Sequence, residues 1–256
     1  MNVFAFSQGP GLPNCLQIGA AVSRYLFLKH RKPLVGINHC VAHIEIGKLT
    51  TGCRDPVIVY CSGGNTQIIA FTEGRYRIFG ETEDIPVGNA FDVLARKLNL
   101  GMPGGPKIEE LAKNGKWIDL PYVVKGMDFS FSGIVTECTK LLEKGKKKED
   151  ICYSFQETCF TMLTEATERA LAHTDKREVL LTGGVAANKR FQKMLGMMCR
   201  ERGAKFYVVP REYAGDCGAM IAWIGILAYK SGQITEIEDS RIKPKWRTDE
   251  VDITWL

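Results

Sequence analysis

The chain has 256 residues, of which 45% are hydrophobic and 25% are charged, and its formal net charge is +5. This is an ordinary globular composition, and it excludes disordered, collagen-like and coiled-coil chains. The modest positive charge is compatible with an anionic partner but does not require one.

The nine cysteines form no CxxC pair. The N-terminal stretch MNVFAFSQGPGLP lacks a basic start and is interrupted by Gly and Pro, unlike a signal peptide. The longest apolar run, 219–229, is too short to span a bilayer. We therefore expect a soluble intracellular protein with no membrane partner. Its thiols should be reduced and buried, because five of them lie among apolar neighbours: Cys15, Cys61, Cys138, Cys159 and Cys199.

The first part of the chain alternates predicted strands and helices. Glycine pairs and Glu-Gly mark the turns between the later strands. The predicted elements are a strand at 3–6, a helix at 15–30, a strand at 34–37, a helix through two histidines to about residue 49, and three strands in 56–82 with turns at 63–64 and 73–74.

The second part follows the same pattern and repeats a strand ending in Gly-Gly, which indicates two related α/β lobes. The basic run 144–150 is interpreted as a solvated connector, with a contact to nucleic acid as the alternative. The predicted elements are a helix over 88–100, a loop at 101–107, helices at 132–143 and 149–172, a strand, Gly-Gly turn and helix in 177–195, a strand at 204–210 and a helix in 214–232 that should be buried all round.

His39 and His43 lie one turn apart on one side of the predicted helix. Two imidazoles at this spacing can bind one divalent metal, or they can be satisfied polar residues at a helix edge. A zincin metalloprotease would place a glutamate general base directly after the first histidine, where this chain has Cys40. A third ligand must come from elsewhere, and Tyr60 and Asp216 are candidates because each lies at the end of a predicted element.

Three glycine-rich turns, YCSGGNT, TGGVAAN and PGGPKIEE, allow the backbone to approach a ligand closely. Successive backbone N–H groups there can hold a phosphate, although such turns also occur as simple tight turns. Asn188 could offer its amide to a base or ribose, and Glu109 could accept from ribose hydroxyls or lie on a solvated helix face. Asp92 lies beside an apolar stripe and needs a partner if it is buried.

The segments NHCVAHIEIG, VYCSGGNTQIIAF, GETEDIPVGNAFDVLARKL, PGGPKIEELA, KGMDFSFSGI, LLTGGVAANKRFQ and DCGAMIAWIG occur in this order. Together they resemble the tRNA threonylcarbamoyladenosine transferase family over nearly the whole chain. Two of these segments are similar to the sequences of the archaeal and eukaryotic branch of the family, which is the catalytic subunit of the KEOPS complex: GETEDIPVGNAFD and KGMDFSFSG. The resemblance implies an α/β, two-lobed fold of the actin, sugar-kinase and heat-shock-ATPase (ASKHA) type with a central cleft.

The resemblance also implies a reaction, in which threonylcarbamoyl-AMP donates its acyl group to N6 of the adenosine 3′ of the anticodon and AMP leaves. The acceptors would be tRNAs that read codons beginning with A. One divalent ion (iron, zinc or magnesium) would be held by His39, His43 and Asp216, with Tyr60 completing or flanking the site. The donor would be held at its phosphate by Ser62, Gly63, Gly64, Asn65 and Thr66, and at its ribose, base and acyl parts by Asp92, Gly105, Glu109 and Asn188.

The partners implied are tRNA, a small atypical kinase or ATPase subunit, a dimerising subunit and an accessory tRNA-binding subunit, in the cytoplasm and nucleus. The lobes would be 1–56 with 217–256, and 57–216. Family members usually begin with a strand similar to LGIEGSANK and a β-hairpin before the segment matching FSQGPGLP. We therefore expect the first strands of the N-terminal lobe to be missing and the true start to lie upstream.

Two other interpretations fit parts of the pattern. An ATP-dependent phosphotransferase or ATPase of the same fold would use the glycine turns for phosphate but would not need the paired histidines. A non-catalytic scaffold subunit would bind partners and would show neither bound metal nor tight nucleotide binding.

Overall fold

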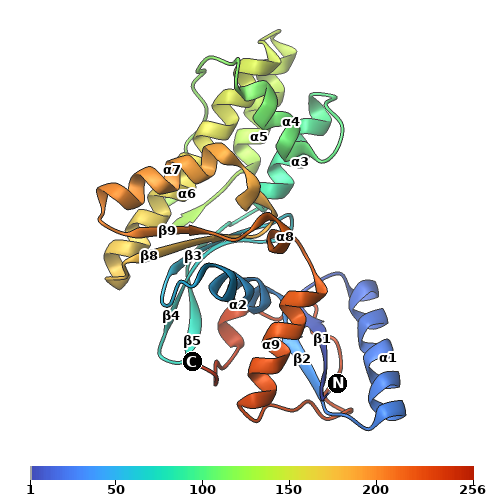
Figure 1. Cartoon of the computed structure of the whole chain (residues 1–256). Helices are drawn as coiled ribbons and strands as arrows, with labels where there is room; N and C mark the ends of the chain where they lie inside the picture. The colour runs from blue at the N-terminus through green and yellow to red at the C-terminus, as the bar shows by residue number, and fades with distance from the viewer. Residues whose placement is uncertain (1) are drawn as a thin grey trace. The chain divides into compact units, whose positions relative to one another are not determined.

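The computed structural model describes residues 2–256 as a mixed α/β protein (Figure 1). The contacts divide the chain into two compact units. Unit 1 contains the chain up to Cys53 together with Phe71–Ile78 and Val209–Leu256, and unit 2 contains Arg54–Ala70 and Phe79–Val208.

Unit 1 is built on two parallel strands, β1 (Phe4–Gly9) and β2 (Leu34–Asn38), which are joined by the crossover helix α1 (Pro13–His30). Helices α1 and α9 (Gly218–Lys230) both pack against β1, and α2 (His39–Thr51) packs against α9 (Figure 1). Two short helices complete the unit, α8 (Arg211–Ala214) and the 3-10 turn η2 (Thr248–Glu250).

Because β2 continues directly into α2, the histidines begin at the carboxyl end of the strand. The end of β1 lies beside it, since the two strands are parallel and Gly9 pairs with Asn38. The carboxyl ends of parallel strands are where binding sites of open α/β sheets form.

Unit 2 is built on the strands β3 (Val57–Cys61), β8 (Glu178–Thr182) and β9 (Lys205–Val208), all parallel. The antiparallel strand β4 (Thr66–Thr72) pairs with β3, and β5 (Arg75–Glu81) lies beyond it, so the sheet order is β5-β4-β3-β8-β9. Within these two strands, residues 71–78 belong to unit 1. Every residue of β3 is buried, which explains its uninterrupted apolar sequence.

The helices of unit 2 pack on this sheet and on one another, with α6 (Lys148–Thr174) contacting β3 and α7 (Lys189–Glu201) contacting β9 (Figure 1). Four phenylalanines from three of these helices pack ring to ring in the core, two pairs stacked and one edge-to-face, with ring centroids 4.4–5.4 Å apart: Phe91, Phe155, Phe160 and Phe191. The elements are α3 (Val87–Lys97), α4 (Gly104–Ala112), β6 (Val124–Lys125), β7 (Asp128–Phe129), α5 (Ser132–Glu143), α6 (Lys148–Thr174), η1 (Gly184–Ala187) and α7 (Lys189–Glu201).

Most predicted strands and helices are confirmed within a few residues, and so are the turns at 63–64 and 73–74. The predicted loop at 101–107 is wrong in its second half, because α4 already begins at Gly104. Pro106 lies in the first turn of α4, where a helix does not need its backbone N–H.

Two burial predictions are also wrong. Cys15 is exposed because it lies on the solvent side of α1, whereas the other four cysteines predicted as buried are buried. Helix α9 is buried on one side only, and Ile226 is 41% exposed. Its other side lines an open groove along the outer edge of β1, so its apolar sequence does not mean complete burial.

The predicted lobe limits stay a prediction, and the compact units differ from them in three places. Residues 71–78 and 209–216 belong to unit 1, and residues 54–56 belong to unit 2. Asp216 therefore lies in the same unit as the two histidines.

Candidate functional site

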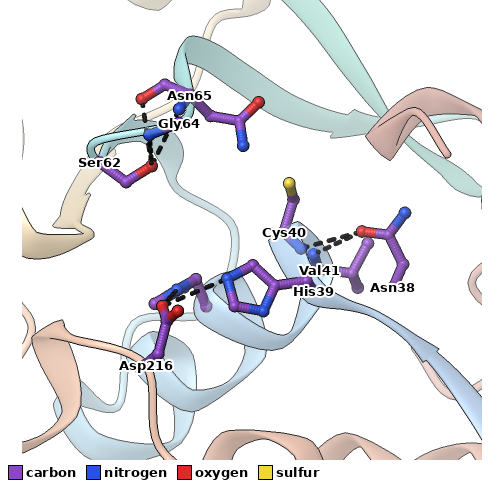
Figure 2. Close-up of polar contacts among 9 residues, drawn as sticks. Asn38, His39, Cys40, Val41, Ser62, Gly64, Asn65 and Asp216 are labelled. Atoms are coloured by element: carbon purple, nitrogen blue, oxygen red, sulfur yellow. Dashed lines mark hydrogen bonds and ion pairs between the residues drawn. The ribbon is translucent and has the colours of Figure 1, made fainter. Parts of the chain in front are cut away.

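The position of the two histidines is set by the start of α2. Asn38 has an extended backbone, and its Oδ1 accepts hydrogen bonds from Cys40 N at 3.0 Å and Val41 N at 3.2 Å (Figure 2). This is an N-cap, which satisfies two of the backbone donors that a helix start leaves free. His39 is thus the first residue of α2, and His43 follows one turn later.

Asp216 brings a carboxylate to both imidazoles, from the segment just before α9. Its Oδ1 lies 3.3 Å from His39 Nε2 and 3.1 Å from His43 Nε2. Figure 2 shows the carboxylate facing the His39 ring. His43 is buried, His39 is partly exposed and Asp216 is exposed. The group is therefore fixed in the protein at His43 and accessible to solvent at Asp216. We call these three residues the triad.

Hydrogen bonds from His39, and then from His43, hold the pKa of Asp216 well below its usual range, although partial burial opposes them. The carboxylate is therefore ionised at neutral pH. A negatively charged oxygen between two imidazole nitrogens is a donor set that a divalent cation can bind directly.

The triad also has the spacing that a metal site needs. Its ligand atoms all lie within 4.8 Å of one another, and residues 2–256 contain no other such group of three His, Cys, Asp or Glu side chains. With metal–ligand bonds of about 2.1 Å, neighbouring ligands of a tetrahedral or octahedral ion lie roughly 3.0–3.4 Å apart. The two distances to Asp216 fall in that range, and two imidazoles with one carboxylate suit zinc or iron.

Two neighbours of the triad do not take part in it. Cys40, at the position of the zincin glutamate, is buried. Glu45 is buried and accepts a 2.5 Å hydrogen bond from the Tyr76 hydroxyl, with the Lys48 ammonium 3.9 Å away. Glu45 therefore anchors α2 through these contacts. Helix α2 has no glutamate at the position of the general base in zincin metalloproteases.

Tyr60, predicted to complete the metal site, lies inside β3 and is 1% exposed. It is paired in the sheet with Gln67 and Thr182 and belongs to unit 2. Its side chain is buried, and its part in metal binding stays a prediction.

Unit 2 contains a cavity of about 270 Å³. We call it the unit 2 cavity. It brings together residues from the turn after β3, the helices α3 and α4, and the turn around η1. Five of its lining residues were predicted as donor-binding residues: Gly63, Asp92, Gly105, Glu109 and Asn188. Phe91 and Val185 also line it and were missed, because an apolar side chain in a helical stripe or after a turn gives no sign that it faces a ligand.

The polar residues of the unit 2 cavity also tie its walls together. The Asp92 carboxylate accepts from Gly104 N at 2.8 Å, which joins α3 to the start of α4. Glu109 on α4 accepts from Lys189 N at 2.7 Å, at the start of α7. Each carboxylate has further lone pairs available to a ligand.

The Asn188 side chain makes two internal hydrogen bonds. Its Oδ1 caps α7 by accepting from Phe191 N at 3.0 Å, and its Nδ2 donates to Gln156 Oε1 at 2.9 Å. Gln156 is buried, so it holds the Asn188 amide in one orientation. The link to Gln156 could not be seen in the sequence, since the two residues are 32 positions apart.

The SGGNT turn is organised by its serine. Ser62 Oγ accepts from Gly64 N at 3.2 Å and from Asn65 N at 3.0 Å (Figure 2). Thr66 is buried, and its hydroxyl accepts from Val87 N at the start of α3. Of the five residues predicted at the phosphate, Gly63 alone lines the unit 2 cavity, and all five roles stay predictions.

The TGG turn differs from the predicted strand, turn and helix. Gly183 has φ +90°, and a Cβ there would lie 2.3 Å from the Cys61 carbonyl oxygen, so only glycine fits. The 3-10 turn η1 then intervenes before α7 starts at Lys189. The cavity wall on this side is therefore formed by η1 together with Asn188, the N-cap of α7.

Comparisons with known proteins agree with the resemblance. The family model described as tRNA N6-adenosine threonylcarbamoyltransferase matches residues 1–223. The protein of that name from Archaeoglobus fulgidus is 59% identical over 256 residues, covering 100% of this chain and 79% of the relative. Its counterpart from Thermococcus kodakarensis is 55% identical with the same coverage. A probable bifunctional tRNA threonylcarbamoyladenosine biosynthesis protein from Methanocaldococcus jannaschii is 55% identical, and this chain spans 48% of it.

Among solved structures, T. kodakarensis HypF matches with a TM-score of 0.67 and 13% identity, over 90% of this chain and 41% of HypF. The activator of 2-hydroxyisocaproyl-CoA dehydratase from Clostridium difficile matches with a TM-score of 0.54 and 14% identity, over 88% of this chain and 85% of the activator. These likenesses confirm the ASKHA type of fold. No helix within residues 2–256 has both the length and the apolar character needed to cross a membrane. The chain belongs to the tRNA N6-adenosine threonylcarbamoyltransferase family and is a transferase that modifies tRNA.

Proposed function

We propose that the chain transfers the threonylcarbamoyl group from threonylcarbamoyl-AMP to tRNA with the help of a divalent ion at the triad. The acceptor is N6 of the adenosine 3′ of the anticodon, in tRNAs that read codons beginning with A. The observation that carries this proposal is the convergence of His39, His43 and Asp216 in a chain of this family. The new bond joins N6 to the carbamoyl carbon, the bond from that carbon to the phosphate oxygen breaks, AMP leaves, and N6 loses a proton.

The unit 2 cavity supplies suitable chemistry for the AMP part of the donor. Phe91 and Val185 offer apolar contacts to a base. Asp92 and Glu109 offer carboxylate oxygens to ribose hydroxyls. Gly63 leaves backbone open to a phosphate, since it carries no side chain.

The triad supplies suitable chemistry for a metal. His43 is buried and Asp216 is ionised, so the site carries a fixed imidazole and a full negative charge. When bound there, a divalent ion would stabilise charge that develops on the carbonyl or phosphate during transfer. His39 and His43 are the side chains that would orient it.

Further partners and location are also proposed. A net charge of +5 is small for a chain that holds tRNA alone, because tRNA affinity depends on the number of phosphates neutralised. We therefore propose that it works with the other KEOPS subunits: a small atypical kinase or ATPase, a dimerising subunit and an accessory tRNA-binding subunit. The proposed location is the cytoplasm and nucleus.

A reconstituted transfer assay tests the proposal. The chain, threonylcarbamoyl-AMP, tRNA and the partner subunits are mixed, and N6-threonylcarbamoyladenosine is quantified by mass spectrometry after digestion. We expect product from the wild type and from His30→Ala, a matched control at an exposed position of helix α1 outside the triad. His39→Ala should lower the rate by about 100-fold, the upper end of the loss when groups supporting a metal are removed. Equal rates for His39→Ala and the wild type would disprove the role of the triad.

A further inference from the structure

The sequence RIKPKWR at 241–247, which we call the basic segment, shows a regular pattern of exposure in unit 1. Its apolar positions are partly buried, and Ile242 packs against the core cluster of β1, α1 and β2. The alternate positions are exposed and all are cationic: Arg241, Lys243, Lys245 and Arg247. Four positive side chains thus face solvent within seven residues.

The basic segment is held rigidly against the carboxyl end of β1. Lys243 N donates to the Gln8 carbonyl at 2.7 Å, and the buried Gln8 side chain donates to the Arg241 carbonyl at 2.8 Å. A Cβ at Gly9 would lie 1.9 Å from the Lys243 carbonyl oxygen, so the two backbones touch. The cations are therefore displayed on a fixed backbone and not on a loose tail.

The basic segment also contacts the residue that starts the metal-binding helix. Asn38 Nδ2 lies 3.3 Å from the carbonyl oxygens of both Trp246 and Arg247. The same side chain caps α2 directly before His39. The cations and the triad are thus connected through one buried asparagine inside unit 1.

The charges of the basic segment are only partly neutralised by its neighbours. Arg247 pairs with Asp249 at 3.1 Å. The Lys243 ammonium lies 4.5 Å above the Trp246 ring, a contact that leaves its full charge in place. Lys243, Lys245 and Trp246 line the same open hollow, which places two cations beside an aromatic ring, with Glu250 as the one acidic residue of its lining.

We propose that the basic segment binds the phosphate backbone of the tRNA substrate next to the triad. Exposed cations on a rigid backbone neutralise phosphates with little loss of ordering entropy. An aromatic side chain among cations favours nucleic acid, since it adds a stacking surface. The proposal depends on tRNA as the substrate and is independent of the metal and of the donor.

Salt-dependent RNA binding tests the proposal. The full chain, assembled with the proposed partner subunits, is titrated onto fluorescent tRNA at several salt concentrations, without donor, and anisotropy is measured. The test variant is Lys243→Glu with Lys245→Glu. The matched control is Lys29→Glu with Lys32→Glu, which makes the same charge change at exposed positions near the opposite ends of β1 and β2.

The test variant should weaken binding by at least about 10-fold and lower the slope of log K against log salt by about 1.5, the value for two lost phosphate contacts. The control should lose less affinity and keep the wild-type slope. Lys245→Arg should bind like the wild type, because it keeps the charge. All variants should melt within about 1 °C of the wild type, since each change is at the surface.

Equal losses in the test variant and the control would overturn the proposal, because net charge alone would then explain binding. Wild-type tRNA affinity in both the test variant and the control would also overturn the proposal. The basic segment would then be assigned to an acidic protein surface instead of tRNA. A wild type that binds tRNA normally but makes no product would disprove the proposed transfer chemistry without affecting this result.

Discussion

Replacing Asn38 tests how unit 1 holds the triad, because one side chain joins two segments there. In Asn38→Ala, Cys40 N and Val41 N lose their acceptor at the start of α2. The carbonyl groups of Trp246 and Arg247 lose their donor at the same time. The residue is 2% exposed, so water cannot simply replace it.

The magnitude follows from these contacts. Loss of an N-cap costs about 1–2 kcal/mol of unfolding free energy. The two contacts to carbonyl groups are long, at 3.3 Å, and together add about 1 kcal/mol. We expect a loss of about 2–3 kcal/mol, which lowers the melting temperature by roughly 4–12 °C at 2–4 °C per kcal/mol.

Calorimetry of the wild type, Asn38→Ala and Asn38→Asp measures this. The aspartate keeps the cap acceptor and adds a charge that the helix N-terminus favours, but it turns an oxygen toward the two carbonyl groups. It should therefore melt between the other two proteins. Asn38→Ala should also bind divalent metal more weakly, because His39 directly follows the lost cap. An Asn38→Ala protein that melts within 1 °C of the wild type would refute this reasoning.

Three further predictions concern other parts of the fold. Tyr76→Phe should lower the unfolding free energy in urea by about 1.5–3 kcal/mol, because the hydroxyl donates to the buried carboxylate of Glu45; a loss under 0.5 kcal/mol would contradict this. Burial raises the pKa of Asp84, but hydrogen bonds from the Ser132 hydroxyl and from backbone N–H groups outweigh it, so the folded pKa is lowered. Asp84 therefore stabilises the fold above the unfolded pKa of about 3.9, and this stability is lost as pH falls through the lowered folded pKa. Asp84→Asn should flatten the acid limb of the stability curve, and an unchanged limb would argue against the assignment. Iodoacetamide should modify Cys15 first, as the exposed cysteine in residues 2–256, and peptide mass spectrometry that finds a buried thiol reacting equally fast would contradict the packing.

The sequence predicts the triad well and the unit 2 cavity less well, for a physical reason. His39 and His43 are four residues apart on one helix, so local geometry alone places them together. Asp216 is 173 positions from His43. It was predicted as a ligand only because it lies at the end of a predicted element and because the family resemblance implies it. Thr66 shows the limit, because a hydroxyl after a glycine turn can bind a ligand or hold a helix start, and here it accepts a hydrogen bond from Val87 N at the start of α3 while its predicted ligand role stays a prediction.

The contacts that join distant segments were not predictable in the same way. Tyr76 lies 31 positions from Glu45, and no periodicity links a strand hydroxyl to a helix carboxylate. The start of α4 was missed because Pro106 suggests a loop, although proline is tolerated in a first helical turn. Such contacts depend on how the elements pack, which local sequence patterns do not encode.

Metal removal and return is the most direct test of the central claim that the triad binds the ion needed for transfer. The wild type, His43→Ala and the control His30→Ala are stripped with a chelator, and transfer to tRNA is measured before and after a divalent ion is added. We predict that stripping abolishes transfer in the wild type and the control, and that the added ion restores it in both but not in His43→Ala. Full-rate transfer by the stripped wild type, or wild-type metal binding and transfer by His43→Ala, would contradict the account.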